Sequence, residues 1–74
     1  MTRLHIHAPK GTYLAQVRRR GCRNWETLGK PVRSKTTAAN RAVTTMLVRE
    51  EYKRARVLFC AEWYDPIVVM EASV

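Results

Sequence analysis

Hydrophobic and polar residues alternate regularly from Thr12 to Arg18. One set of alternating positions holds Tyr13, Ala15 and Val17, and the other holds Leu14, Gln16 and Arg18. Successive side chains of an extended chain point to opposite faces, so this pattern predicts a β-strand with one apolar face. Leu4 to His7 alternates over a shorter stretch, which Pro9 would end because proline cannot donate to a strand ladder.

A second extended segment, residues 24–28, follows an arginine-rich turn. It contains Trp25, Thr27 and Leu28, and we expect it to stop at Gly29 and Pro31. The turn between the two segments is Arg19-Arg20-Gly21-Cys22-Arg23. Together the segments predict a β-hairpin with an arginine-rich tip.

A helix is predicted from about Thr37 to Glu51. Ser34, Thr36 and Thr37 offer N-terminal caps, because their hydroxyl oxygens accept hydrogen bonds from free backbone N–H groups. Apolar residues then recur every three or four positions, as in an amphipathic helix. This apolar stripe comprises Ala39, Ala42, Val43, Met46, Leu47 and Tyr52. Residues 50–53 suit either a continuing helix or a connection.

Two more strands are predicted after the helix. Ala55 to Ala61 contains a run of apolar residues, and Ile67 to Met70 is dense in β-branched residues. The turn between them would pair the second strand with the first. The chain is thus predicted to be a single α+β domain, residues 1–74, with an antiparallel sheet packed on one helix in the order ββαββ. We expect the helix to cover the face of Tyr13, Ala15 and Val17.

Positive charge is concentrated in the first half of the chain. The whole chain has 14 Lys and Arg against 6 Asp and Glu, which gives a formal net charge of +8. Residues 1–41 contain ten cations and one acid, whereas residues 42–74 contain four cations and five acids. The first half is therefore the expected contact surface for an anionic partner, either nucleic acid or an acidic protein or ribonucleoprotein.

Basic residues in and beyond the hairpin tip form the strongest candidate site. Guanidinium groups bind phosphate oxygens in bidentate fashion, and a helix N-terminus adds free amide donors. Gln16 and Arg18 share a strand face from which they could reach base edges. The expected nucleic-acid-binding residues are Gln16, Arg18, Arg19, Arg20, Arg23, Lys30, Arg33, Lys35 and Arg41. The alternative is a solvated basic surface that only keeps the protein soluble.

Aromatic residues at two places leave a choice between binding and packing. Trp25, beside the basic segment, would either stack on a base or belong to the core. Trp63, Tyr64 and Asp65 would either anchor a protein partner or close the last hairpin over the core.

No catalytic, metal or cofactor site is predicted. The chain lacks a glycine-rich phosphate loop, a nucleophile elbow and paired candidate catalytic carboxylates, so we expect no enzymatic activity. His5 and His7 would share a strand face, but the sequence offers them no third metal ligand. Cys22 and Cys60 form no C-x-x-C pair, and Cys60 is expected in the core. Reduced thiols and the lack of a long apolar stretch predict a cytoplasmic protein without membrane contact.

Residues 11–42 resemble the arm-binding DNA-binding domains of phage integrases and their plant ethylene-response relatives. The similar segments are G-T-Y-L-A-Q-V-R-R-R-G, N-W-E-T-L-G and S-K-T-T-A-A-N-R-A. The resemblance implies a sheet that contacts DNA through Gln16, Arg18, Arg20 and Arg23. The chain departs from that family after the helix, where it adds residues 57–70.

These observations predict a small basic accessory or regulatory protein of a phage or mobile element that contacts nucleic acid. The size, charge and layout also resemble small phage proteins, including some anti-CRISPR inhibitors. That resemblance implies the rival function, a protein-binding inhibitor or adaptor that targets a host complex. A third alternative is a structural or oligomeric phage component. A homodimer is a further expectation, because a chain of 74 residues has room for only a thin core, and small cores often gain stability from oligomerisation.

Overall fold

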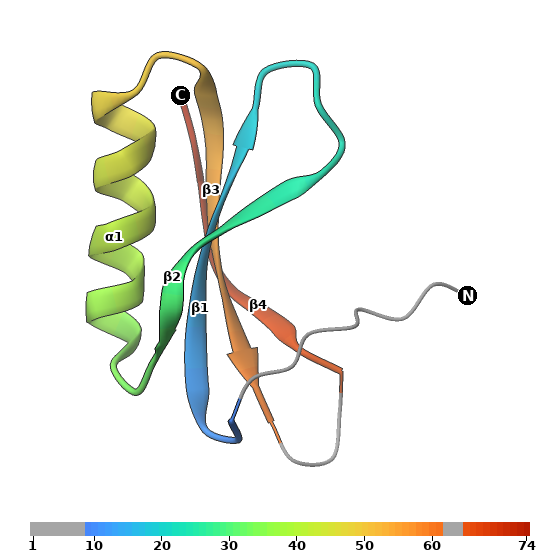
Figure 1. Ribbon diagram of the computed structural model, residues 1–74, viewed down its shortest axis with the longest axis vertical. Coiled ribbons are helices and arrows are strands. Elements are labelled where there is room, and N and C mark those ends of the chain that lie inside the picture. Colours follow the sequence, from blue (N-terminus) through green and yellow to red (C-terminus); the bar gives the residue numbers. More distant parts are fainter. Residues whose placement is uncertain (1–8, 62–64) are drawn as a thin grey trace.

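In residues 9–61 and 65–74, which the computed structural model describes, four antiparallel strands form one sheet against which a helix packs (Figure 1). The elements are β1 (Thr12–Arg19), β2 (Trp25–Val32), α1 (Lys35–Val48), β3 (Tyr52–Cys60) and β4 (Ile67–Ser73). The predicted α+β class and the order ββαββ are therefore confirmed.

The strand order across the sheet is β2-β1-β3-β4, so β1 and β3 are central and β2 and β4 are the edges. β1 pairs with β3 along its whole length, from Thr12 opposite Cys60 to Arg19 opposite Tyr52. β4 pairs with β3, as predicted from the turn between them. The residues that follow the helix thus extend the sheet on the side of β1 away from β2.

β2 continues to Val32, so the predicted stop at Gly29 and Pro31 was wrong. The register shifts between the pairs Ala15–Leu28 and Tyr13–Val32, which leaves an irregularity in β2. Gly29 has a φ of +66° there, a left-handed conformation that glycine adopts without strain. Proline is tolerated because β2 is an edge strand.

The helix begins two residues before the predicted start at Thr37 and ends three residues before Glu51, and its buried face differs in part from the predicted apolar stripe. Ser34 is its N-cap, and the Ser34 Oγ accepts a hydrogen bond of 3.2 Å from the Thr37 N–H. The helix ends at Val48, so Tyr52 belongs to β3 and not to the helical stripe. Leu47, another predicted stripe residue, is 67% exposed. The buried helix residues are Ala38, Ala42 and Met46.

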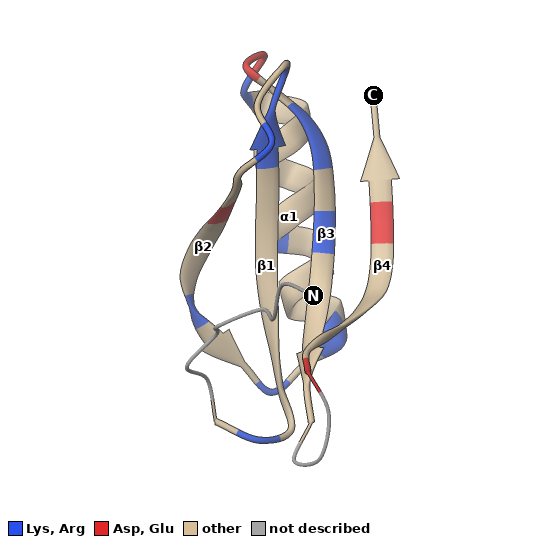
Figure 2. Cartoon of the chain, turned by 90° about the vertical axis from the view of Figure 1, so that its right-hand side faces the viewer, with Lys and Arg blue, Asp and Glu red and all other residues tan. Residues whose placement is uncertain are grey.

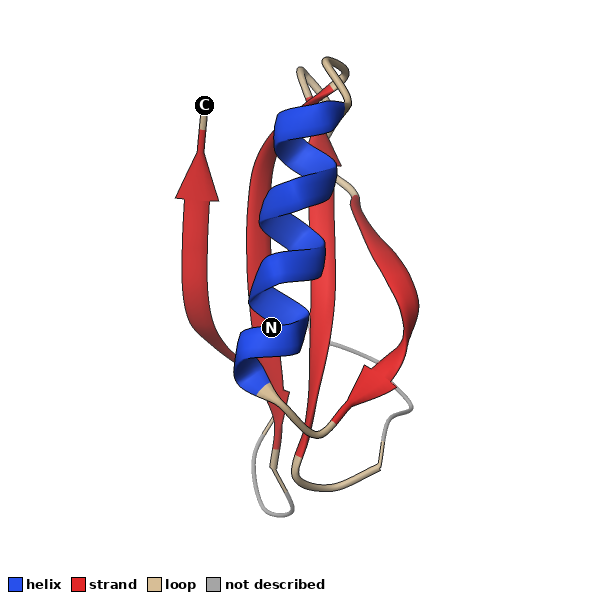
Figure 3. Cartoon of the chain, turned by 90° about the vertical axis from the view of Figure 1, so that its left-hand side faces the viewer, coloured by secondary structure: helices blue, strands red, loops and turns tan. Residues whose placement is uncertain are grey.

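The main core lies between α1 and the face of the sheet that Figure 3 shows behind the helix. Small side chains at Ala38, Ala42 and Ala55 let the helix approach the sheet closely, and each is completely buried. The expected contact with Ala15 and Val17 is confirmed, and Tyr13 packs at the margin of the same cluster. A second, smaller buried cluster comprises Leu14, Leu58 and Cys60. The sheet face away from the helix is shown in Figure 2.

Candidate nucleic-acid interface

Three arginines from the two central strands lie on the face of the sheet away from the helix. Arg18 of β1 is directly opposite Arg54 of β3, and Gln16 is directly opposite Arg56. Residues opposite each other in an antiparallel pair present their side chains on the same face. Figure 2 shows basic segments side by side where β1 ends and β3 begins, and another further along β3, with the helix behind them.

Trp25 of β2 completes this cluster. It is directly opposite Arg18, whose Cζ lies 5.0 Å from the centroid of the indole ring. The Cζ of Arg56 reaches the same ring from two strands away, at 4.1 Å. Trp25 is half-buried and, among the described residues, belongs to neither core cluster, so the core alternative for this residue gains no support. We call Arg18, Trp25, Arg54 and Arg56 the arginine face.

Gln16 supports this face from within. Its Nε2 donates a hydrogen bond of 3.0 Å to Thr27 Oγ1, and its Oε1 accepts one of 2.8 Å from Arg56 Nε. The residue is only 5% exposed. Gln16 therefore holds the Arg56 guanidinium in position, and its amide is occupied on both sides.

The charges of the arginine face are only partly balanced by the protein. Neither Arg18 nor Arg54 forms an ion pair with any of the residues that the structure describes. Burial lowers the pKa of the Arg56 guanidinium, Glu71 on β4 raises it and Arg18 lowers it. A guanidinium remains charged at neutral pH. The face thus carries three cations beside one carboxylate, that of Glu71, which is directly opposite Arg56.

A shallow depression adjoins Arg54 at the β4 side of this face. Its walls are Arg54, Glu71, Ala72 and Ser73. It is polar and open, and its walls include one cation and one carboxylate, so it does not suit the enclosure of an apolar ligand.

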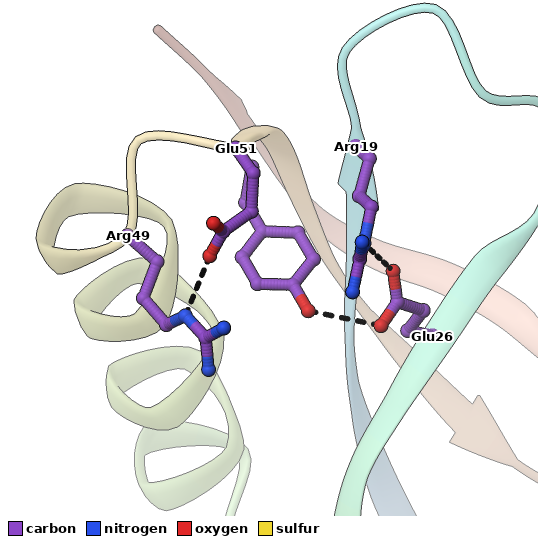
Figure 4. Close-up of polar contacts among 5 residues, drawn as sticks. Arg19, Glu26, Arg49 and Glu51 are labelled. Carbon is purple, nitrogen blue, oxygen red and sulfur yellow. Dashed lines mark hydrogen bonds and ion pairs between the residues drawn. The ribbon is translucent and has the colours of Figure 1, made fainter.

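Arg19, a predicted contact residue, lies on the other side of the sheet. Its Nε forms an ion pair of 2.8 Å with Glu26 Oε2, and the Tyr52 hydroxyl donates to Glu26 Oε1 at 2.9 Å (Figure 4). The hydrogen bond from Tyr52, followed by the contacts with Arg19, lowers the pKa of Glu26 against the opposing effect of burial. The Cζ atoms of Arg19 and Arg49 are each 5.5 Å from the Tyr52 ring centroid. This network joins the hairpin to the end of α1.

Arg41 also has a structural contact. Its Nη1 donates to the carbonyl oxygens of Leu28 and Lys30, at 3.3 and 3.1 Å. A Cβ at Gly29 would lie 3.1 Å from the same nitrogen, so the guanidinium packs closely on β2. Arg41 thereby covers backbone carbonyls of the β2 edge strand.

The remaining predicted residues are divided between the two ends of the sheet. Arg20 and Arg23 are exposed at the hairpin tip, next to the start of the arginine face. Lys30 near the end of β2 is also exposed, as are Arg33 and Lys35 at the connection to α1. Figure 1 shows this connection at the opposite end of the sheet from the hairpin tip. The predicted site is therefore not one continuous patch.

Arg54 and Arg56 were missed by the sequence analysis. The acidic residues of the second half hid them when charge was summed over residues 42–74. A local signal was present, because Arg54, Ala55, Arg56 and Val57 alternate between cationic and apolar residues. Such alternation predicts a strand with one basic face.

The other candidates give a mixed outcome. Cys60 is buried as expected, and burial raises the pKa of its thiol, whereas Cys22 is exposed. Asp65 is exposed. The predictions for His5, His7, Trp63 and Tyr64 lie outside the described residues. Within the described ranges no three His, Cys, Asp or Glu side chains gather as metal ligands, and α1 is too short and polar to cross a membrane.

Comparison with known proteins adds no assignment. No protein-family model matches the chain, and no curated protein or solved structure is significantly similar to it. The resemblance of residues 11–42 to integrase and ethylene-response domains remains a prediction.

Proposed function

We propose that this protein binds nucleic acid through the arginine face, with Arg20 and Arg23 of the hairpin tip extending the contact. The observation that carries the proposal is the Arg18–Arg54 pair. Two cations directly opposite each other in a sheet repel, and an unpaired arrangement of this kind destabilises the fold. A bound phosphate between the two guanidinium groups would convert that repulsion into attraction.

The geometry of the guanidinium groups favours phosphate, which offers several oxygens, over an anion with a single acceptor. A guanidinium presents its donors in a planar fork that matches two phosphate oxygens. Arg56 is oriented by Gln16 and Trp25, so less conformational freedom is lost when its remaining donors bind. A row of such groups on two adjacent strands fits the repeating charge of a nucleic-acid backbone.

Trp25 supports contact with unpaired bases in addition to phosphate. Proteins that bind single strands combine a basic groove with an aromatic ring on which bases stack. Trp25 is half-buried, and its ring centroid lies 5.0 Å from Arg18 Cζ and 4.1 Å from Arg56 Cζ, so the ring and the phosphate-binding groups are close together. The proposed complex therefore has phosphates on the arginines and a base near Trp25.

A fluorescence-anisotropy titration tests the binding. Labelled duplex DNA, single-stranded DNA and RNA of equal length are titrated at low salt and at about 0.15 M salt. We expect dissociation constants in the micromolar range or below that persist at the higher salt for at least one of the three. Binding that disappears at the higher salt for all three would contradict the proposal and favour an acidic protein partner, to be sought by pull-down after nuclease treatment.

The role of Trp25 is tested separately by its fluorescence. In a Trp63→Phe background Trp25 is the only tryptophan of the chain, so its emission reports on its own surroundings. Stacking on a base predicts quenching by single-stranded oligonucleotide. Trp25→Ala should then weaken single-strand binding by about 1–3 kcal/mol, and Trp25→Phe should weaken it less. Unchanged emission at saturation would limit the interaction to phosphate contacts.

A further inference from the structure

We infer that the β4 edge of the sheet is a self-association surface, through which two copies of this chain pair antiparallel and form one continuous sheet. The inference concerns a different surface from the arginine face, and it holds whether or not nucleic acid binds there.

The two edges of the sheet differ in how they are protected. At β2, Arg41 occupies the carbonyls of Leu28 and Lys30, and the strand is interrupted at Gly29 and Pro31. These are common ways in which proteins prevent edge-to-edge pairing. At β4, the described residues form a ladder with β3 only, and the strand Ile67–Ser73 contains no proline, glycine or lysine. The outer hydrogen-bonding groups of β4 are thus the better template for another strand.

Exposed apolar side chains gather at the same edge. Among the described residues, five large hydrophobic side chains are exposed. Ile67 at 47%, Val68 at 45% and Val74 at 73% lie in β4 or directly follow it. In an antiparallel pair, apolar side chains of the two strands lie next to each other and are removed from water.

Charge makes this edge more favourable than the β2 edge for contact between two copies of the chain. Residues 65–74 contain Asp65 and Glu71 and no cation, so their formal charge is −2. The other 64 residues carry +10, which gives the whole chain its net charge of +8. Two copies that met at β2 would bring Lys30 and the neighbouring basic residues together. Two copies that meet at β4 keep their cations apart, and repulsion between molecules of high net charge is smallest there.

Symmetry then determines the arrangement of the proposed dimer. Antiparallel pairing of identical edges places the two-fold axis perpendicular to the sheet, so both arginine faces lie on the same side. Strands in a sheet are about 4.8 Å apart, which puts the two β3 strands about 14 Å apart and the two β1 strands about 24 Å apart. The dimer would present six arginines of the two arginine faces on one surface.

Sedimentation velocity and light scattering over a concentration series test the inference. Protein freed of nucleic acid by nuclease and high salt is used, so that bridging by a ligand cannot imitate pairing. We expect the mass to rise with concentration from 8.6 kDa toward twice that value. A chain that stays monomeric from about 1 to 500 µM would overturn the inference.

Three lysine substitutions locate the contact. Val68→Lys and Ile67→Lys place a charge on β4 at side chains that are already half exposed, and each should weaken association at least about tenfold. Thr44→Lys adds the same charge on the exposed side of α1 and should leave association within about twofold. Equal association of all three variants would place the contact elsewhere and overturn the inference.

Hydrogen exchange of the backbone amides tests the same inference in the unmodified chain, so it does not depend on whether a β4 variant folds. Amides of β4 should exchange more slowly as concentration rises, while those of β2 should not change. Exchange at β4 that is independent of concentration over the same range would overturn the inference without any substitution.

Discussion

The two faces of the sheet differ sharply although the same strands build both. On β3, Ala55 and Val57 are completely buried on the helix side, whereas Arg54 and Arg56 lie on the opposite face. On β1, Val17 is completely buried and its neighbour Arg18 is opposite another arginine. The fold is thus held mainly from one side, and the other side accommodates like charges that the fold itself does not require.

In the part of β1 and β3 nearest the hairpin tip, buried residues that stabilise the fold therefore alternate with the arginines of the proposed binding face, whereas Leu14 and Leu58 further along the same strands belong to the second buried cluster. A substitution one position along a strand, or one position along the helix, should therefore change its consequence from one property to the other.

On the helix-covered face, shortening a buried side chain should lower the free energy of unfolding most. Met46 is 5% exposed and its neighbour Leu47 is 67% exposed. Met46→Ala should lower the free energy of unfolding by about 2–5 kcal/mol, because it removes buried methylene groups and leaves a cavity. Leu47→Ala should change it by less than about 0.5 kcal/mol. Urea denaturation followed by circular dichroism measures both, and a reversed order would return Leu47 to the core.

Charge reversal on the arginine face should lower the affinity for nucleic acid without lowering the stability of the fold. Arg54→Glu places a carboxylate opposite Arg18, and an opposite-charge cross-strand pair is worth about 0.2–1 kcal/mol. Stability should therefore stay constant or rise slightly. Affinity for nucleic acid should fall at least about tenfold at low salt, because one phosphate contact becomes a repulsion. Loss of stability together with affinity would mean that Arg54 supports the fold.

Arg41 distinguishes a structural cation from a binding one. Arg41→Met keeps the aliphatic stem but removes the hydrogen bonds to the carbonyls of Leu28 and Lys30. Stability should fall by about 1 kcal/mol, while the affinity for nucleic acid should stay within about twofold. A large loss of affinity in a variant of unchanged stability would restore Arg41 to the binding surface.

The smallest expected effect is the pH dependence that Glu26 contributes. The hydrogen bond from Tyr52 and the ion pair with Arg19 hold the pKa of Glu26 below its ordinary value of 4.5. The stabilisation is present above that value and is lost as the pH falls through the lowered pKa of the folded state. Glu26→Gln should therefore reduce the difference in denaturation midpoint between pH 7 and pH 3. An unchanged difference between the two midpoints would show that protonation of Glu26 does not affect the stability of the fold.

Local patterns predicted most of the fold. Alternation located β1, and a run of apolar residues located the buried part of β3. The hydroxyl residues before the alanine-rich segment predicted the Ser34 cap. The errors fell where tertiary context decides. An edge position let β2 pass through Gly29 and Pro31, and pairing with Arg19 drew Tyr52 into β3 although its spacing suits the helix.

The candidate site was less predictable because it depends on which strands become neighbours. Arg18 and Arg54 are 36 positions apart in the sequence and meet only because β3 pairs with β1. Arg19 and Arg41 looked equivalent to their neighbours by charge, but they lie on carboxylate and carbonyl oxygens of the protein itself. Summed charge could not distinguish these roles, since it ignores the face on which each side chain lies.

One matched pair of variants shows whether the arginine face or net charge alone binds nucleic acid. Arg54→Gln and Arg49→Gln each remove one charge, but Arg49 pairs with Glu51 on the helix side. The dependence of affinity on salt is measured for both and for the unmodified chain. Arg54→Gln should weaken binding several-fold and make the log–log slope shallower by about 0.7–0.9, while Arg49→Gln should leave affinity and slope nearly unchanged. Equal losses in the two variants would contradict the account, because binding would then follow net charge alone.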